Sequence, residues 1–237
     1  MKRWELLGEA RTPQGELLTL MRQDREMVLL ADGKPLMSSR AHGSEEALAA
    51  LGCRDLQQLR ADPPSVLVGG LGMGFTLAAT LRLLPPTATV VVAELVAAVV
   101  DWNRGPLGAL AQHPLRDPRV RVEVADVRVT LQSNTSRFDA VLLDVDNGPD
   151  AFTTSNNVAL YADQGLAAIR AALKPGGVLA VWSAWEDRKF EQRLKANGFH
   201  VTVERVRARG KKGGRRHTLF LGRTEAGIMR PPTRMGG

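Results

Sequence analysis

The sequence predicts an α/β fold: a mostly parallel sheet covered by helices on both faces, preceded by a small β-rich domain. From residue 62 onward, short apolar runs alternate with stretches of helical length. This alternation is typical of parallel strands joined by crossover helices. Before residue 62 the apolar runs are separated by turn signals, which favours β-hairpins.

The composition is that of a globular protein. The 237 residues suit one large α/β domain with a small appendage. No apolar run reaches the ~20 residues that span a bilayer, and the N-terminal residues lack a secretory apolar segment. We therefore expect a cytoplasmic protein with no membrane association. Cys53 is the single cysteine and the four histidines lack metal-ligand spacing, so we expect no disulfide and no metal.

Positive charge is concentrated near the C-terminus. The net charge is +7, yet Val201–Gly237 alone holds ten Lys or Arg against two Glu. Six of the ten residues from 207 to 216 are cationic. This basic segment indicates either an anionic partner or a solvated hairpin tip, and nucleic acid is the less favoured partner.

Residues 1–61 are expected to form a small domain of β-hairpins that ends in a helix. Glu16–Met21 and Glu26–Ala31 read as strands, and the turn signal Asp32-Gly33 precedes a further apolar pair. Ser44 is expected to cap a helix that ends at Gly52. Asp62-Pro63-Pro64 then breaks the chain.

Residues 62–223 are expected to form the larger domain. The predicted strands are Val66–Val68, Thr89–Ala93, Val120–Val124, Ala140–Leu143, Val178–Trp182, Phe199–Val206 and Thr218–Leu221. The predicted helices are Phe75–Leu84, Asp163–Leu173 and Glu186–Asn197. Residues 224–237 show no periodicity, and we expect a mobile tail there.

Four strand ends in succession carry a distinctive feature, and ligands of open α/β sheets bind at that edge. The glycine-rich loop Gly69–Gly74 follows the first strand and lets a backbone approach a ligand, although it also suits a tight turn. Glu94 can accept hydrogen bonds from ribose hydroxyls, or start a helix. Asp126 can accept an adenine N–H, or cap a helix. Asp144 can hold an amine nucleophile or take its proton.

Other residues near these ends have two interpretations each. Asp146 and Asn147 can extend the site or form the turn before Gly148-Pro149. Trp182 and Trp185 can wall an acceptor pocket or pack in the core. Tyr161, the single tyrosine, can close over the pocket or pack beneath a helix. A nicotinamide-dependent dehydrogenase would explain the glycine loop and Glu94 but not the two aspartates.

Several segments together resemble the spermidine synthase family of S-adenosylmethionine (AdoMet)-dependent transferases. The matching segments are Leu30–Gly33, Gly69–Gly74, Glu94, Asp126, Phe138–Asp144, Leu160-Tyr161 and Leu173–Gly177. The resemblance implies the Rossmann-like, seven-stranded AdoMet-dependent methyltransferase fold, mostly parallel with an antiparallel last strand. It also implies cofactor contacts at Gly69, Gly70, Leu71, Gly72, Gly74, Glu94, Leu95, Asp126, Val127 and Asp144. Asp144 would stand at the transfer site, with Asp146 and Tyr161 as further catalytic candidates.

The departures from that family lie where aminopropyl chemistry is expected. The glycine loop contains no acid, and Asn147 stands where the family has a second aspartate. The family's acidic gatekeepers have no clear match in Arg40–Glu46. The sequence Leu143-Asp144-Val145-Asp146 more closely resembles that of spermidine-synthase-like methyltransferases. This resemblance and the missing acids favour a methyltransferase that uses AdoMet on an amine or other nucleophile. Aminopropyl transfer from decarboxylated AdoMet is the alternative, and a non-catalytic ligand-binding or scaffold protein is the second.

The acceptor is left open by the sequence. We expect a small-molecule or peptide acceptor, with Asn147, Trp182 and Trp185 as candidate contacts. The basic segment 207–216 would suit an anionic acceptor. A homodimer is compatible with the sequence, and no metal is needed because the sulfonium donor is already activated by its charge.

Overall fold

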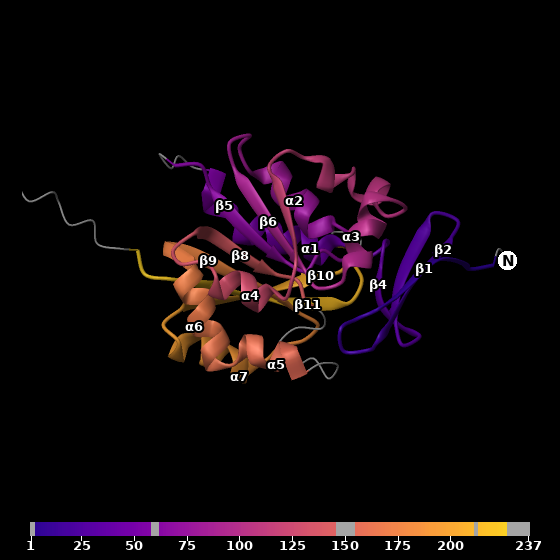
Figure 1. The fold of residues 1–237 in the computed structure, drawn as a ribbon. Helices are drawn as coiled ribbons and strands as arrows, with labels where there is room; N and C mark the ends of the chain where they lie inside the picture. The colour runs from indigo at the N-terminus through magenta and orange to yellow at the C-terminus, as the bar shows by residue number, and fades with distance from the viewer. Residues whose placement is uncertain (1–2, 58–61, 146–154, 211–212, 227–237) are drawn as a thin grey trace, which may run out of the picture.

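The computed structural model describes residues 3–57, 62–145, 155–210 and 213–226, which contain two sheets (Figure 1). The smaller sheet is antiparallel, with the order β1-β2-β3-β4. Its strands are β1 (Glu5–Arg11), β2 (Leu17–Gln23), β3 (Glu26–Ala31) and β4 (Lys34–Ser38). The sequence predicted the last three but missed β1.

Strand β1 was not predicted because its hydrophobic pattern is irregular. It lies at the edge of the sheet, paired only with β2, and its register shifts between Leu6 and Gly8. A side chain at Gly8 would lie 2.5 Å from the indole nitrogen of Trp102. The glycine therefore lets the small sheet approach Trp102 on the larger domain, and this contact leaves no trace in local periodicity.

The larger sheet has seven strands in the order β10-β11-β9-β8-β5-β6-β7. They are β5 (Ser65–Gly69), β6 (Thr89–Glu94), β7 (Val120–Val124), β8 (Phe138–Leu143), β9 (Leu173–Ser183), β10 (His200–Arg207) and β11 (Arg216–Arg223). Only the last strand, β11, is antiparallel to its neighbours β9 and β10. The predicted fold class is thus confirmed, including the antiparallel last strand.

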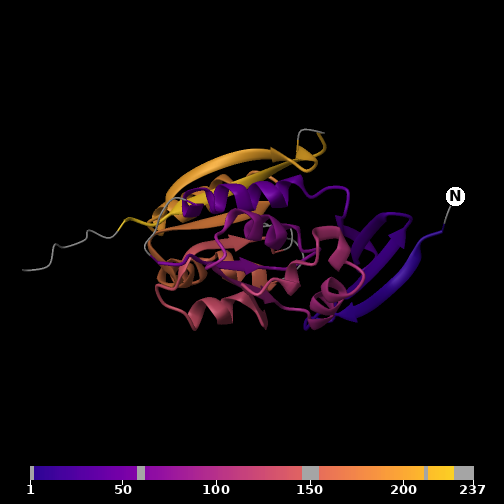
Figure 2. The same ribbon diagram turned by 90° about the horizontal axis from the view of Figure 1, so that it is seen from above.

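Helices cover both faces of this sheet, as Figures 1 and 2 show. They are α1 (Gly43–Gly52), α2 (Phe75–Leu83), α3 (Ala97–Arg104), α4 (Val127–Gln132), α5 (Ser155–Tyr161), α6 (Asp163–Ala172) and α7 (Arg188–Ala196). Three short 3-10 turns lie at Arg54–Gln57, Gly108–Ala111 and Pro114–Arg116. None of the helices in the described ranges is long and apolar enough to cross a membrane.

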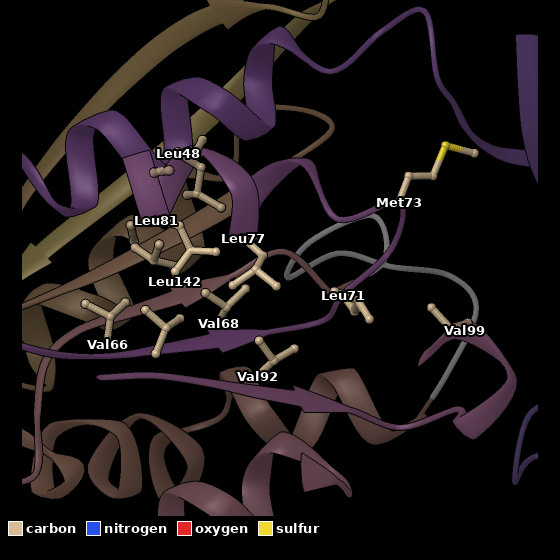
Figure 3. Packing of buried hydrophobic residues seen from close by; sticks show 14 of the residues in the cluster. Leu48, Val66, Val68, Leu71, Met73, Leu77, Leu81, Val92, Val99 and Leu142 are labelled. Carbon is tan, nitrogen blue, oxygen red and sulfur yellow. The ribbon is translucent and has the colours of Figure 1, made fainter. Parts of the chain in front are cut away.

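The core divides into two clusters, one on each face of the sheet. Along β5, Val66 and Val68 belong to the first cluster whereas Leu67 belongs to the second. This follows from the two-residue period of a strand, and it explains why the strands read as continuous apolar runs. Figure 3 shows the first cluster, in which Leu48 of α1 and Leu77 of α2 pack over Val66, Val68 and Leu142.

Helix α1 packs on the larger sheet, against α2 and β9. Its first residue is Gly43, and the Gly43 N–H donates to the carbonyl of Ala208 at 2.7 Å. The prediction that Ser44 caps this helix is therefore wrong: His42 holds that position, and Ser44 lies in the first turn with its hydroxyl turned to other partners. The end of the helix at Gly52 is confirmed.

The predicted boundary between residues 61 and 62 adjoins residues 58–61, which lie outside the described residues. Most of the predicted tail, residues 227–237, also lies outside them. These domain limits stay predictions.

Candidate active site

The predicted strand ends meet in one cavity at the carboxyl edge of the larger sheet. Gly70, Glu94, Asp126 and Asp144 all line it. The smaller sheet forms the opposite wall through apolar side chains and the polar residues before β2. These wall residues are Thr12, Gln14, Glu16, Leu18, Leu29, Leu36 and Met37. The cavity therefore lies between the two sheets.

The glycine loop holds two strand ends together. The Asp144 N–H donates to the Gly69 carbonyl, and the Gly70 N–H donates to the Ala93 carbonyl, both at 2.9 Å. Gly70 has φ 86°, and a Cβ on it would lie 2.5 Å from the Asp144 carbonyl oxygen. Only glycine tolerates both the positive φ and the short distance to Asp144, so the loop approaches Asp144 and leaves the cavity open beside it.

Glu94 is buried at the end of β6 and binds the loop backbone. One carboxylate oxygen accepts the Leu71 N–H at 2.9 Å, and the other accepts the Val96 N–H at 2.8 Å. Each oxygen has a second lone pair, so hydroxyl donors in the cavity can be accepted as well. The carboxylate thus braces the loop while facing the ligand space.

Asp126 caps helix α4, which was the alternative reading of this residue. Its side chain accepts the Arg128 N–H at 2.9 Å and forms an ion pair with the Arg128 guanidinium at 2.7 Å. Burial alone would raise the pKa of Asp126, but the hydrogen bonds from Arg128 hold it below its usual value. Both residues line the cavity, so this end of the site presents a paired aspartate and arginine.

Asp144 lies directly after β8 and is oriented from α2. The Thr76 hydroxyl donates to Asp144 Oδ2 at 2.6 Å. Thr76 is buried in the first turn of α2, immediately after the glycine loop. The same loop therefore shapes the cavity and positions the residue that orients Asp144.

Glu45 is a second carboxylate beside Asp144. It lies in the first turn of α1 and lines the same cavity. Burial, and then the charge of Asp144, raise the pKa of Glu45 to about 8. The family's acidic gatekeepers have no clear match in the sequence of Arg40–Glu46, but Glu45 of this segment lies beside Asp144 in the cavity.

Behind Glu45, hydrogen bonds lead to strand β11. The Ser44 hydroxyl donates to Glu45 Oε2 at 2.6 Å, and the Ser44 hydroxyl oxygen lies 2.9 Å from His217 Nδ1. The His217 ring packs edge-on against Trp182, which lines the cavity. Burial and the nearby Arg215 hold the pKa of His217 below its usual value, which favours the neutral form of the ring.

The other predicted site residues fall in different places. Leu95 and Val127 line the cavity. Trp185 is 39% exposed and is not part of the lining that the described residues form. Tyr161 is buried and packs edge-on against Phe190, so its catalytic role stays a prediction. Asp146 and Asn147 lie outside the described residues.

Sequence reasoning missed Glu45, Thr76, Arg128 and Glu16 as residues of the site. Arg128 carried a local signal, because it follows the capping Asp126 by two residues. Thr76 and Glu45 each stand in the first turn of a helix, where polar residues are common and uninformative. No group of three or more His, Cys, Asp or Glu suited to a metal ion occurs within the described ranges.

Residues 93–219 match the model of a family described as S-adenosyl-L-methionine-dependent methyltransferase. A polyamine aminopropyltransferase of Nitrosomonas europaea is 36% identical over 120 residues, 51% of this chain and 35% of the relative. Polyamine aminopropyltransferase 2 of Pseudomonas aeruginosa is 29% identical over 180 residues, 74% of this chain and 48% of the relative. The chain thus spans about a third to a half of the length of these relatives.

Solved structures share the fold. A spermidine synthase in complex with the transition state analogue AdoDATO has a TM-score of 0.71 at 17% identity, covering 94% of this chain and 74% of that one. The spermidine synthase from Thermotoga maritima has a TM-score of 0.70 at 16% identity, with the same coverage. At such identities the likeness concerns the fold alone.

Proposed function

The chain belongs to the spermidine synthase-like family of AdoMet-dependent transferases, and on that premise we propose that it transfers an aminopropyl group to a cationic amine. The observation that carries the proposal is the pair of carboxylates, Glu45 and Asp144, at one end of the cavity. Two partly buried acids side by side repel each other, and a bound ammonium ion relieves that repulsion. The site is therefore suited to a cation.

This proposal reverses the preference drawn from the sequence. Methyl transfer was favoured there because acids that a dicationic diamine and an aminopropyl donor require were missing. Glu45 supplies one such acid from α1, and Glu16 lines the cavity from the smaller sheet. The names of the two relatives point in the same direction.

The cavity also suits a nucleoside donor. Gly70 lets the loop pass close to Asp144, where any Cβ would collide with the Asp144 carbonyl, and the Glu94 carboxylate that lines the cavity is an acceptor suited to ribose hydroxyls. We propose that Asp126 and Arg128 border the adenine and that Asp144 faces the reacting carbon. A sulfonium donor supplies an activated carbon, so the protein has chiefly to align the amine and keep it deprotonated at the moment of attack.

Methyl transfer from AdoMet is the second candidate, and one observation favours it. The loop from Gly69 to Gly74 has no carboxylate to hold the free amine of a decarboxylated donor. The matching family model is also described as a methyltransferase.

The test supplies the purified chain with putrescine and either AdoMet or decarboxylated AdoMet, and follows spermidine and methylated amine by mass spectrometry. We expect spermidine, formed with the decarboxylated donor. Methylated putrescine from AdoMet would instead establish the second candidate. Asp144→Asn should lower turnover by about 10²–10⁴-fold with little loss of donor affinity, as expected of an orienting or proton-accepting carboxylate. No transfer from either donor would contradict the proposal.

A further inference from the structure

We propose that Glu45 is the catalytic base that takes the proton from the acceptor ammonium, and that Ser44 and His217 carry this proton away from the cavity. The inference rests on the proposed function in one respect, namely that the acceptor is an amine. It holds for aminopropyl and methyl transfer alike. It adds α1 and β11 to a site that the sequence placed on strand ends alone.

Ser44 connects Glu45 to His217 through its hydroxyl group. Ser44 is fully buried and contacts Glu45 on one side and His217 on the other, at 2.6 Å and 2.9 Å. A hydroxyl both donates and accepts hydrogen bonds, so a proton can be passed through it. His217 is half-buried, and its ring packs edge-on against the cavity wall residue Trp182. The path therefore begins at the cavity and ends at a group that solvent reaches.

The fold holds Glu45 in place. The Gly43 N–H bonds the Ala208 carbonyl of the β10–β11 hairpin, and a Cβ on Gly43 would collide with the Gly210 backbone. His42 stacks on Phe75 at the start of α2, with ring centroids 4.3 Å apart. The first turn of α1 is thus fixed against both the hairpin and α2. A base must be held in this way to act on a bound amine.

The charges around Glu45 suit a proton acceptor. The ionisable groups that act on it are Asp144 after β8 and Glu46 on its own helix, while Arg215 acts on His217. Burial and these negative charges raise the pKa of Glu45 to about 8, whereas the Ser44 hydrogen bond lowers it. The carboxylate is consequently a stronger base than an ordinary glutamate, and Ser44 tunes its strength.

The acceptor ammonium loses a proton to Glu45 and becomes a neutral amine. The amine nitrogen then bonds to the donor carbon as that carbon's bond to sulfur breaks, and the bonding electron pair stays on sulfur. The product is a secondary ammonium and a neutral thioether. Protonated Glu45 then donates its proton to Ser44 Oγ as the Ser44 hydroxyl turns to donate its own proton to the unprotonated Nδ1 of a neutral His217. The imidazolium releases a proton to water, and the Glu45 carboxylate is restored.

The test is the pH dependence of kcat for putrescine with the donor that the chain uses. Glu45→Gln should lower kcat by at least about 10²-fold and abolish the rise in rate that follows Glu45 ionisation, while Glu45→Asp restores part of it. Ser44→Ala removes the hydrogen bond that lowers the Glu45 pKa, so its rate profile should shift to higher pH. A purely structural role for Ser44 would lower the rate without that shift.

His217→Asn keeps a hydrogen-bonding group beside Ser44 but cannot titrate. We expect a several-fold loss of kcat near pH 7 that added imidazole restores. His200→Asn, an exposed histidine at the start of β10, is the matched control and should neither lose activity nor respond to imidazole. Thermal melting and donor affinity establish that each variant is folded.

Two results would overturn the inference while the proposed function stands. One is transfer by Glu45→Gln with the parent's pH profile, and the other is an unchanged profile in both Ser44→Ala and His217→Asn. Calorimetry of putrescine binding, with methylthioadenosine present and in buffers of different ionisation enthalpy, separates the two proposals. Proton release that Glu45→Gln abolishes supports the base even if neither donor reacts. Absence of putrescine binding would contradict both.

Discussion

Thr76 and Asp144, 68 residues apart, are joined by a hydrogen bond of 2.6 Å from the threonine hydroxyl to Asp144 Oδ2. Thr76 follows the glycine loop and Asp144 follows β8, so the bond links two elements that meet only at the edge of the sheet. It fixes the orientation of a carboxylate that lines the cavity.

Replacing Thr76 by valine should lower turnover about tenfold or more, because a hydrogen bond to a charged group contributes about 1.5–3 kcal/mol. The volume of the side chain is nearly kept, and donor affinity should change little. Thr76→Ser retains the hydroxyl and is the control. Steady-state kinetics and calorimetry measure the two quantities, and equal kcat in Thr76→Val and the parent would show that Asp144 needs no such support.

Removing the Glu94 carboxylate should weaken donor binding through two effects. The Leu71 and Val96 N–H groups lose their acceptor, which loosens the loop, and the ribose hydroxyls lose theirs. Glu94→Ala should therefore raise the Kd for AdoMet or its decarboxylated form about tenfold or more, the equivalent of at least ~1.4 kcal/mol. Glu94→Gln keeps one acceptor oxygen, so its Kd for the donor should lie between those of the parent and Glu94→Ala. Equal affinity in all three proteins would place the ribose elsewhere.

Stability without ligand should depend on pH through Glu45. Because its pKa is about 8 in the folded chain against an ordinary 4.5, the folded state binds the proton more tightly. The free energy of unfolding then falls as pH rises through that window. Glu45→Gln cannot ionise, so its Tm should gain on the parent's between pH 5 and pH 8.5, by at least the about 2–4 °C that ~1 kcal/mol produces in a chain of this size.

Glu46→Gln, one residue further along the same helix, is the matched control for that comparison. Differential scanning calorimetry at several pH values gives the Tm difference directly. A difference between Glu45→Gln and the parent that stays constant with pH would mean that Glu45 ionises normally.

The charges of the basic hairpin offer a test of the acceptor's sign. Arg207 and Arg216 are opposed in the β10–β11 ladder, and both are exposed, as is Arg209. If the acceptor is a cation, replacing all three by serine should lower its KM at low salt by removing repulsion. The difference should vanish toward 1 M salt, where the Debye length falls to ~3 Å. A raised KM in the triple variant would indicate the anionic acceptor that the sequence suggested.

Much of the sheet follows from local pattern. Glu94, Asp126 and Asp144 each stand at the end of a predicted strand, and strands of a parallel sheet end at one edge, so their shared cavity could be predicted. The basic segment 207–216 was likewise expected at that edge, and its described ends, Arg207 of β10 and Arg216 of β11, lie there. Periodicity and the positions of glycine and proline are local properties, and a single sequence displays them.

The partners of these residues were decided by tertiary structure. Asp126 is tied to Arg128, Thr76 holds Asp144, and Glu45 reaches the cavity because α1 packs between α2 and the β10–β11 hairpin. The contact between Ser44 and His217 joins residues 173 positions apart. Such contacts depend on how whole layers stack, and no spacing in the sequence encodes them. The sequence by itself therefore determined the sheet and the acids along its edge, whereas only the packed chain decided which residues contact them.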